Sequence, residues 1–199
     1  MTLWNYYHTP ASVDEALELL RSYAGKARVI AGGTDLLLDI RQGHLPPPEA
    51  LIDITRIGEL CDLHQDGDWL VLGAGVTHTR IVSTDLIAAR ATCLVESCGV
   101  VGGPQVRNVG TLGGNVAHAL PAGDGTTSLV ALDAEAEVIL DGERRWYPIR
   151  ELFVGPGMSL LDPTRDLLIR FRFKLSGPYE ATAFKRIMRP QGVALPILG

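Results

Sequence analysis

Apolar and polar residues follow two different periods in the first part of the chain, residues 1–54. After Ser12 the apolar residues recur at helical spacing, and Ser12 with Glu15 has the spacing of a capping box, in which each side chain accepts a hydrogen bond from a backbone N–H. The short apolar runs at 28–31 and 51–54 predict buried strands. A second helical pattern lies between these strands. The order of strand, helix and strand predicts a small parallel α/β lobe.

The pattern changes after residue 54 to short strands that pair as hairpins. Helical patterns cover 77–98, with a break near Thr84, and 124–132. The glycine-rich segment 100–124 is interpreted as an extended binding loop. Residues 55–177 are therefore predicted to form a second, larger lobe, an antiparallel sheet with flanking helices. Its strands are expected at 60–64, 69–72, 134–140, 145–148 and 167–175.

The end of the sequence is apolar and predicts a further element. Phe184 to Ile187 is expected to form a strand, and the run from Ala194 to Gly199 has the pattern of the beginning of another apolar element. An apolar end with nothing after it would leave an exposed hydrophobic patch. We therefore expect residues 178–199 to be the start of a C-terminal domain that is truncated in this sequence.

The composition is that of an ordinary, mildly acidic globular protein. The net charge is -5 at pH 7 and the 18 lysines and arginines are spread along the chain, which argues against nucleic-acid and anionic-membrane partners. No apolar stretch approaches the roughly 20 residues that a membrane-spanning helix needs, and the N-terminus lacks a signal-peptide pattern. The cysteines, Cys61, Cys93 and Cys98, match no disulfide framework. A reducing, cytoplasmic location is expected.

Two glycine-rich segments carry the candidate chemistry. The first is 31–35 (Ala-Gly-Gly-Thr-Asp), and the second is 111–115 (Thr-Leu-Gly-Gly-Asn), followed by 121–124 (Pro-Ala-Gly-Asp). Paired glycines allow positive φ and close approach of a ligand, and successive N–H groups in such turns can bind an anion. Either segment alone is more readily explained as a structural turn. Both together indicate a long ligand with a charged middle, such as a dinucleotide.

Other nucleotide and catalytic patterns are missing from the sequence. Gly73-Ala74-Gly75 lacks the third glycine of a Rossmann fingerprint, and no P-loop pattern is present. The histidines have no spacing suited to metal ligation and no Ser-His-Asp arrangement is discernible, so neither metal ligands nor catalytic residues are assigned. Arg107 could neutralise phosphate or brace the glycine loop, and the second interpretation is preferred. His118 is expected to be a buried core histidine rather than a ligand.

The residues around both segments resemble a known family. The stretches 31–36 and 105–119 resemble the two FAD-binding signatures of molybdenum hydroxylase flavoproteins, the medium subunits of the xanthine dehydrogenase and carbon monoxide dehydrogenase family. The turn at 121–124 matches the acidic turn that follows the second signature. The resemblance extends from Trp4 to Gly199, whereas family members usually continue into a C-terminal domain. It implies an α+β fold of the PCMH type, in which two lobes bind FAD between them.

The resemblance also implies which residues bind FAD. Residues 29–36 would wrap the pyrophosphate and the adjacent ribityl chain, and residues 111–115 would bring backbone N–H groups onto the phosphates from the other side. Asp124 would accept hydrogen bonds from sugar or ribityl hydroxyls. With three further contact positions, the expected cofactor-binding set is Val29, Ile30, Ala31, Gly32, Gly33, Thr34, Asp35, Leu36, Val101, Thr111, Leu112, Gly113, Gly114, Asn115, Asp124, Ile169 and Lys185.

The function that the resemblance implies is electron transfer. An iron–sulfur small subunit would deliver electrons to FAD on this chain, which would pass them to NAD, a quinone or oxygen, while a molybdopterin-binding large subunit oxidises the substrate. The expected assembly is a hetero-oligomer, a dimer of heterotrimers. Two alternatives stay open. One is a stand-alone FAD-dependent oxidase or reductase of the same two-lobed fold, for which His118 is the candidate base or attachment point, and the other is a non-catalytic nucleotide-binding module.

Overall fold

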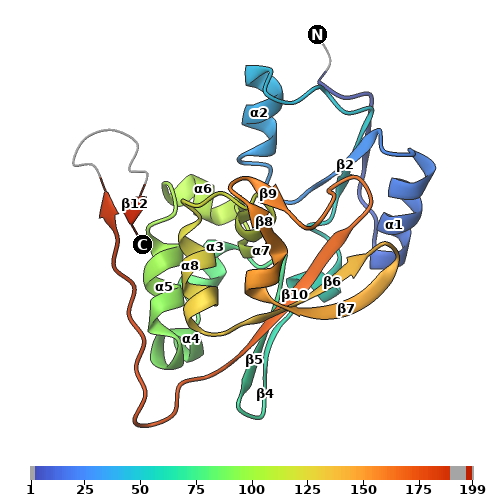
Figure 1. Cartoon of the computed structure of the whole chain (residues 1–199). Helices are drawn as coiled ribbons and strands as arrows, with labels where there is room; N and C mark the ends of the chain where they lie inside the picture. The colour runs from blue at the N-terminus through green and yellow to red at the C-terminus, as the bar shows by residue number, and fades with distance from the viewer. Residues whose placement is uncertain (1–2, 189–195, 199) are drawn as a thin grey trace.

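The fold consists of two main β-sheets with helices packed around them (Figure 1). The structure is a computed structural model, and it describes residues 3–188 and 196–198. The N-terminal part of the chain, blue in Figure 1, forms the smaller sheet, and the rest forms the larger sheet and most of the helices. The predicted α+β fold, with a small parallel lobe and a larger antiparallel lobe, is confirmed.

The smaller sheet has the strand order β1-β3-β2, and both strand pairs are parallel. Its strands are β1 (Tyr6–His8), β2 (Ala27–Ile30) and β3 (Ala50–Asp53), and the intervening helices are α1 (Val13–Ser22) and α2 (Leu36–Gln42). The sequence missed β1 because this short, largely exposed strand contains no aliphatic run. Since parallel strands end at the same edge of a sheet, the first glycine segment leaves the sheet beside the end of β3.

The larger sheet is antiparallel throughout, with the strand order β4-β5-β10-β6-β7. Its strands are β4 (Leu63–Asp66), β5 (Trp69–Gly73), β6 (Glu135–Leu140), β7 (Glu143–Pro148) and β10 (Leu167–Lys174). Alternate residues of β10 face opposite sides, as the sequence pattern predicted. Its phenylalanines are fully buried, whereas its arginines bond to glutamates of β6 on the other face. Shorter elements are η1 (Gly58–Cys61), η2 (Ile149–Leu152), β8 (Phe153–Gly155), β9 (Met158–Ser159), β11 (Ile187–Met188) and β12 (Pro196–Leu198).

Short helices lie beside the larger sheet (Figure 1). They are α3 (His78–Val82), α4 (Asp85–Arg90), α5 (Thr92–Gly99), α6 (Pro104–Val109), α7 (Leu112–Ala117) and α8 (Asp124–Ala131). The interpretation of 100–124 as an extended loop is wrong, because Pro104 opens α6 and the Thr111 hydroxyl caps α7. The abundant glycines hid these two helix starts. Within the described part of the chain, no helix is both long and apolar enough to cross a membrane.

Both lobes share one hydrophobic core. Leu20 of α1 and Ile52 of β3 belong to the same buried cluster as Leu72, Leu94 and Phe171 of the larger lobe. The two sheets are therefore joined by packing, and the predicted domain boundary at residue 54 stays a prediction.

The segment after β10, residues 176–186, is an extended strap that runs along the helices (Figure 1, orange to red). It is held by hydrogen bonds between the pairs Arg90–Ser176, Cys93–Thr182, Glu96–Phe184 and Asp124–Arg186. The predicted strand at 184–187 is wrong except at its last residue, because the strap bonds to helices instead of a strand. Of the predicted apolar element 194–199, only 196–198 fall within the described residues, where they form β12.

Candidate functional site

The two glycine segments, the first loop (31–35) and the second loop (111–115), lie next to each other. A Cβ added at Gly32 would lie 2.1 Å from Val109 O and 2.8 Å from Gly110 Cα. The backbone of the first loop therefore touches the backbone that leads into the second loop. Only glycine permits such an approach, because any side chain would collide. The contact brings the end of β2 against the end of α6.

The first loop offers free backbone donors. Within the described residues, the N–H groups of Gly32, Gly33 and Thr34 donate no hydrogen bond to the rest of the backbone. Gly33 has a φ of 68°, which gives the sharp turn in which successive amides can surround an anion. The other predicted residues of this segment flank the turn. Val29 and Ile30 lie in β2 and Ala31 follows them, whereas Asp35 directly precedes α2, which begins at Leu36. The loop is suited to a phosphate or a diphosphate.

The second loop does not present its amides in the same way. Four of its five N–H groups already have acceptors in the protein, in the pairs Leu112–Val76, Gly113–Ala74, Gly114–Thr111 and Asn115–Thr111. The loop is the capped first turn of α7, and capping engages the amides at a helix start. These four amides are thus engaged within the protein, and the expectation that residues 111–115 contact the phosphates stays a prediction. Within the described residues, the side-chain group of the second loop that is left for a ligand is Asn115 Oδ1, since the Thr111 hydroxyl caps α7 and Leu112 is fully buried.

Two buried polar atoms beside the second loop have no partner. Asn115 Oδ1 and Thr126 Oγ1 are sealed from solvent and make no hydrogen bond among the residues described. A Cβ added at Gly123 would lie 3.2 Å from the first atom and 3.1 Å from the second, so both atoms face the turn at 121–124. A buried polar group without a partner costs about 1–3 kcal/mol, so we expect a water molecule or a ligand to satisfy them. The sequence predicted Asn115 but carried no signal for Thr126.

Asp124 is engaged by the strap. Arg186 Nη1 donates a 2.6 Å hydrogen bond to Asp124 Oδ2, and the two side chains are only 13% and 7% exposed. Burial raises the pKa of the Asp124 carboxyl above its usual range, and Arg186 opposes that rise. One oxygen of the predicted ligand-binding carboxylate is therefore already taken. Arg186 was missed because a contact across 62 positions leaves no local pattern.

The remaining predicted contact residues occupy three different environments. Ile169 is fully buried in β10, and its carbonyl accepts a hydrogen bond from Ala74 N–H, so its side chain belongs to the core. Lys185 is exposed on the strap. Val101 is half-buried, and its carbonyl accepts a 3.1 Å hydrogen bond from Arg107 Nη1. Arg107 Nη1 also donates to Gly102 O at 2.9 Å, so Arg107 braces residues 101–102, and its role at the second glycine loop stays a prediction.

Two histidines lie at the loops; the expectation for His118 is wrong, and no sequence pattern indicated that His78 is buried. His118 is not buried: its side chain is 30% exposed, and its ring nitrogens lie 3.9 and 4.0 Å from carboxylate oxygens of Asp35 and Asp39. It is the residue that ends α7, where the helix faces the first lobe instead of the core. His78, by contrast, is 2% exposed, and its Nδ1 has no partner in the described structure. Burial, assisted by Arg107, lowers the pKa of His78 to about 4.

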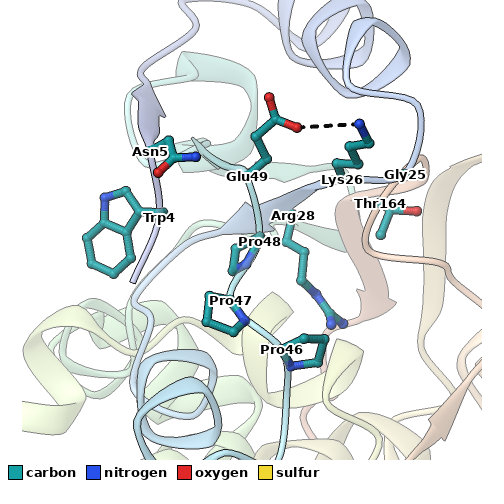
Figure 2. A pocket seen from close by; sticks show the side chains of 10 residues that line it. All are labelled: Trp4, Asn5, Gly25, Lys26, Arg28, Pro46, Pro47, Pro48, Glu49 and Thr164. Atoms are coloured by element: carbon teal, nitrogen blue, oxygen red, sulfur yellow. Dashed lines mark ion pairs between the residues drawn. The ribbon is translucent and has the colours of Figure 1, made fainter. Parts of the chain in front are cut away.

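Two surface pockets lie away from the glycine loops. One of about 520 Å³ is bounded by Trp4, Lys26, Arg28 and the prolines 46–48 (Figure 2). It opens at the amino ends of the parallel strands, whereas the first loop follows the carboxyl end of β2, the edge at which open α/β sheets bind ligands. Another, of about 360 Å³, lies over the larger sheet beside Trp146. Among the described residues, no cluster of His, Cys, Asp or Glu could hold a metal ion, and the cysteines are free.

Residues 3–173 match the family model described as the FAD binding domain in molybdopterin dehydrogenase. The carbon monoxide dehydrogenase medium chain of Hydrogenophaga pseudoflava is 34% identical over 188 residues, which are 94% of this chain and 64% of that protein. The nicotinate dehydrogenase FAD-subunit of Eubacterium barkeri is 30% identical over 198 residues, or 97% of this chain and 66% of that protein. The chain thus spans less than two thirds of the length of these relatives.

Solved structures are similar over the same region. A carbon monoxide dehydrogenase from Hydrogenophaga pseudoflava, which lacks the Mo-pyranopterin moiety of its cofactor, superposes with a TM-score of 0.89 at 31% identity, covering 96% of this chain and 66% of that one. Quinoline 2-oxidoreductase from Pseudomonas putida 86 gives a TM-score of 0.80 at 28% identity, covering 85% and 59%. The fold, the glycine loops and the family match agree, and this chain belongs to the family of FAD binding domains in molybdopterin dehydrogenases.

Proposed function

We propose that this chain is the FAD-binding electron-transfer subunit of a multi-subunit molybdenum hydroxylase or dehydrogenase. The observation that carries the proposal is the contact of the first loop with Val109 and Gly110, which lead into the second loop, together with the free backbone donors at Gly32, Gly33 and Thr34 within the described residues. Relatives named as a medium chain and as an FAD-subunit support it.

The residues at the loops fit a dinucleotide. The oxygens of a diphosphate are acceptors, and the three free amides of the first loop are matching donors. Sugar and ribityl hydroxyls can both donate and accept, which suits Asn115 Oδ1 and Thr126 Oγ1. Because both atoms are sealed, a ligand would reach them only after a shift of the turn at 121–124. Water would otherwise satisfy them.

The protein's own part in the reaction would be binding and orientation. FAD, when bound, supplies the transfer of one or two electrons. The first loop would hold the diphosphate, Arg107 would keep Val101 in place, and Arg186 would fix Asp124. No side chain is required as an acid, base or nucleophile, and we assign none.

The wider assignment extends the same proposal to the whole complex. Electrons would arrive from an iron–sulfur subunit, which receives them from a molybdopterin-binding subunit, and would leave to NAD, a quinone or oxygen. We propose a cytoplasmic hetero-oligomer, a dimer of heterotrimers. Residues 178–199 would begin a further domain, in keeping with the greater length of the relatives.

Co-purification tests this function. A tagged chain isolated from its own cells should carry flavin whose visible absorption is bleached by dithionite. The same preparation should contain partner polypeptides with iron, acid-labile sulfide and molybdenum. Turnover of a substrate by the flavin-loaded chain alone, with no metal-containing partner, would instead identify a stand-alone oxidase or reductase and overturn the proposal.

A further inference from the structure

His78 lies directly against the place where the two glycine loops meet. Its backbone N–H donates to Gly110 O at 3.1 Å, and a Cβ added at Gly110 would lie 3.4 Å from ring atom Cδ2 of His78. Gly110 also packs against Gly32, since a Cβ added at Gly32 would lie 2.8 Å from Gly110 Cα. Gly110 therefore contacts both His78 and Gly32, whose amide is one of the free donors of the first loop.

The imidazole of His78 has an unused position for a proton. Its Nδ1 is buried and has no hydrogen-bond partner among the described residues. Helix α3, which begins at His78, packs against α4, α5 and α6. Of the charged groups around the ring, Arg107 of α6 disfavours the imidazolium and Asp35 of the first loop favours it. Buried titratable groups without partners are rare in proteins and cluster at functional sites.

We propose that His78 takes up one proton from solvent at Nδ1 when a diphosphate binds at the first loop, and that the resulting imidazolium helps to retain it. This inference rests on the proposed function. In the free protein, burial and Arg107 keep the ring neutral. A diphosphate at the first loop brings negative charge to the glycine that Gly110 contacts, and charge of that sign favours the protonated ring. His78 is thus a positioning residue for the cofactor, coupled to pH.

The pH dependence of FAD affinity tests the proposal. Uptake of one proton makes the Kd for FAD rise by up to about tenfold for each pH unit between pH 5 and 7. His78→Asn keeps a polar group near Nδ1 but cannot be protonated, so its Kd should be nearly flat over this range. The matched control is His118→Asn, which removes the other histidine of the loops and should keep the wild-type slope. A slope that survives His78→Asn and disappears in His118→Asn would overturn the proposal.

NMR of the wild-type chain labelled with ¹⁵N-histidine gives a second test that needs no variant. At pH 6 the His78 ring should be neutral without FAD and an imidazolium with saturating FAD. A ring that stays neutral in the FAD complex contradicts this inference while leaving the proposed function intact. A chain that binds no FAD at any pH contradicts both.

Discussion

Arg186 of the strap donates a 2.6 Å hydrogen bond to Asp124 at the start of α8, and both side chains are nearly buried. Removing the guanidinium leaves a buried carboxylate without a counter-charge. We expect Arg186→Met to lower the free energy of unfolding by about 3 kcal/mol at pH 7, measured by urea unfolding. The double variant Arg186→Met with Asp124→Asn should regain most of the lost free energy of unfolding, because it leaves no unpaired charge.

The same pair has a predictable pH dependence. Burial raises the pKa of Asp124 in the folded protein, so its contribution to stability is present at low pH and decreases as pH rises through that raised pKa. Without Arg186 the charge that opposes the effect of burial on Asp124 is gone, so stability should decrease more as pH rises. Arg186→Met should therefore lose more stability at pH 7 than at pH 4. Equal losses at both pH values would show that the carboxylate is not held by this arginine.

The contact between the loops can be tested at Gly32. An alanine there would place its Cβ 2.1 Å from Val109 O, so the two loops must move apart. We expect Gly32→Ala to cost about 2 kcal/mol of stability or more and to weaken FAD binding at least tenfold. Gly58→Ala is the matched control, because a Cβ at Gly58 meets nothing within 4 Å. Equal stability of the two variants would mean that the loops do not touch.

The paired glycines of the second loop have different roles. A Cβ at Gly113 would lie 2.5 Å from Ala74 O, whereas one at Gly114 would meet only Thr111 Oγ1, at 3.2 Å, and Gly114 is exposed. Gly113→Val should therefore unfold the protein or lower its Tm strongly. Gly114→Val should keep the far-UV circular dichroism and lose FAD affinity. A Gly114→Val protein with wild-type affinity would remove Gly114 from the binding surface.

The stability of the free protein should depend on pH through His78. Its pKa is about 4 in the folded state against an ordinary value of 6.5, so the unfolded chain binds more protons between these values. The corresponding stability is fully present above about pH 6.5 and is lost as pH falls toward 4, by about 3 kcal/mol in total. Urea unfolding at pH 7 and pH 4.5 should show this loss in the wild type and a smaller loss in His78→Asn. Equal losses of stability in the wild type and in His78→Asn would exclude His78 as the source of this pH dependence.

The local spacing of apolar and polar residues was sufficient to predict much of the fold. The strands β2 and β3, the helix between them and the hairpin strands of the larger sheet all follow from the alternation of apolar residues and from turn residues. Helices α6 and α7 were missed because helices of six residues have little periodicity, and their start signals at Pro104 and Thr111 are single residues. Short helices of this kind depend on tertiary packing, which the sequence does not display locally.

The candidate site, like the fold, could be predicted only where its features are local in the sequence. The two loops were found because paired glycines and the family signatures are local features. The role of each loop could not be predicted, because free and engaged amides can be distinguished only when the acceptors of their hydrogen bonds are known. His78, Thr126 and Arg186 were missed for the same reason, because burial and contacts between distant residues make them important.

Binding of FAD to the first loop through its backbone amides can be measured by an ¹H–¹⁵N NMR titration of the chain with FAD. The amide signals of Gly32, Gly33 and Thr34 should move downfield and saturate at one FAD per chain, since each gains a hydrogen bond to a charged acceptor. Signals that stay in place at saturating FAD, while amides elsewhere shift or none shifts at all, would contradict the account.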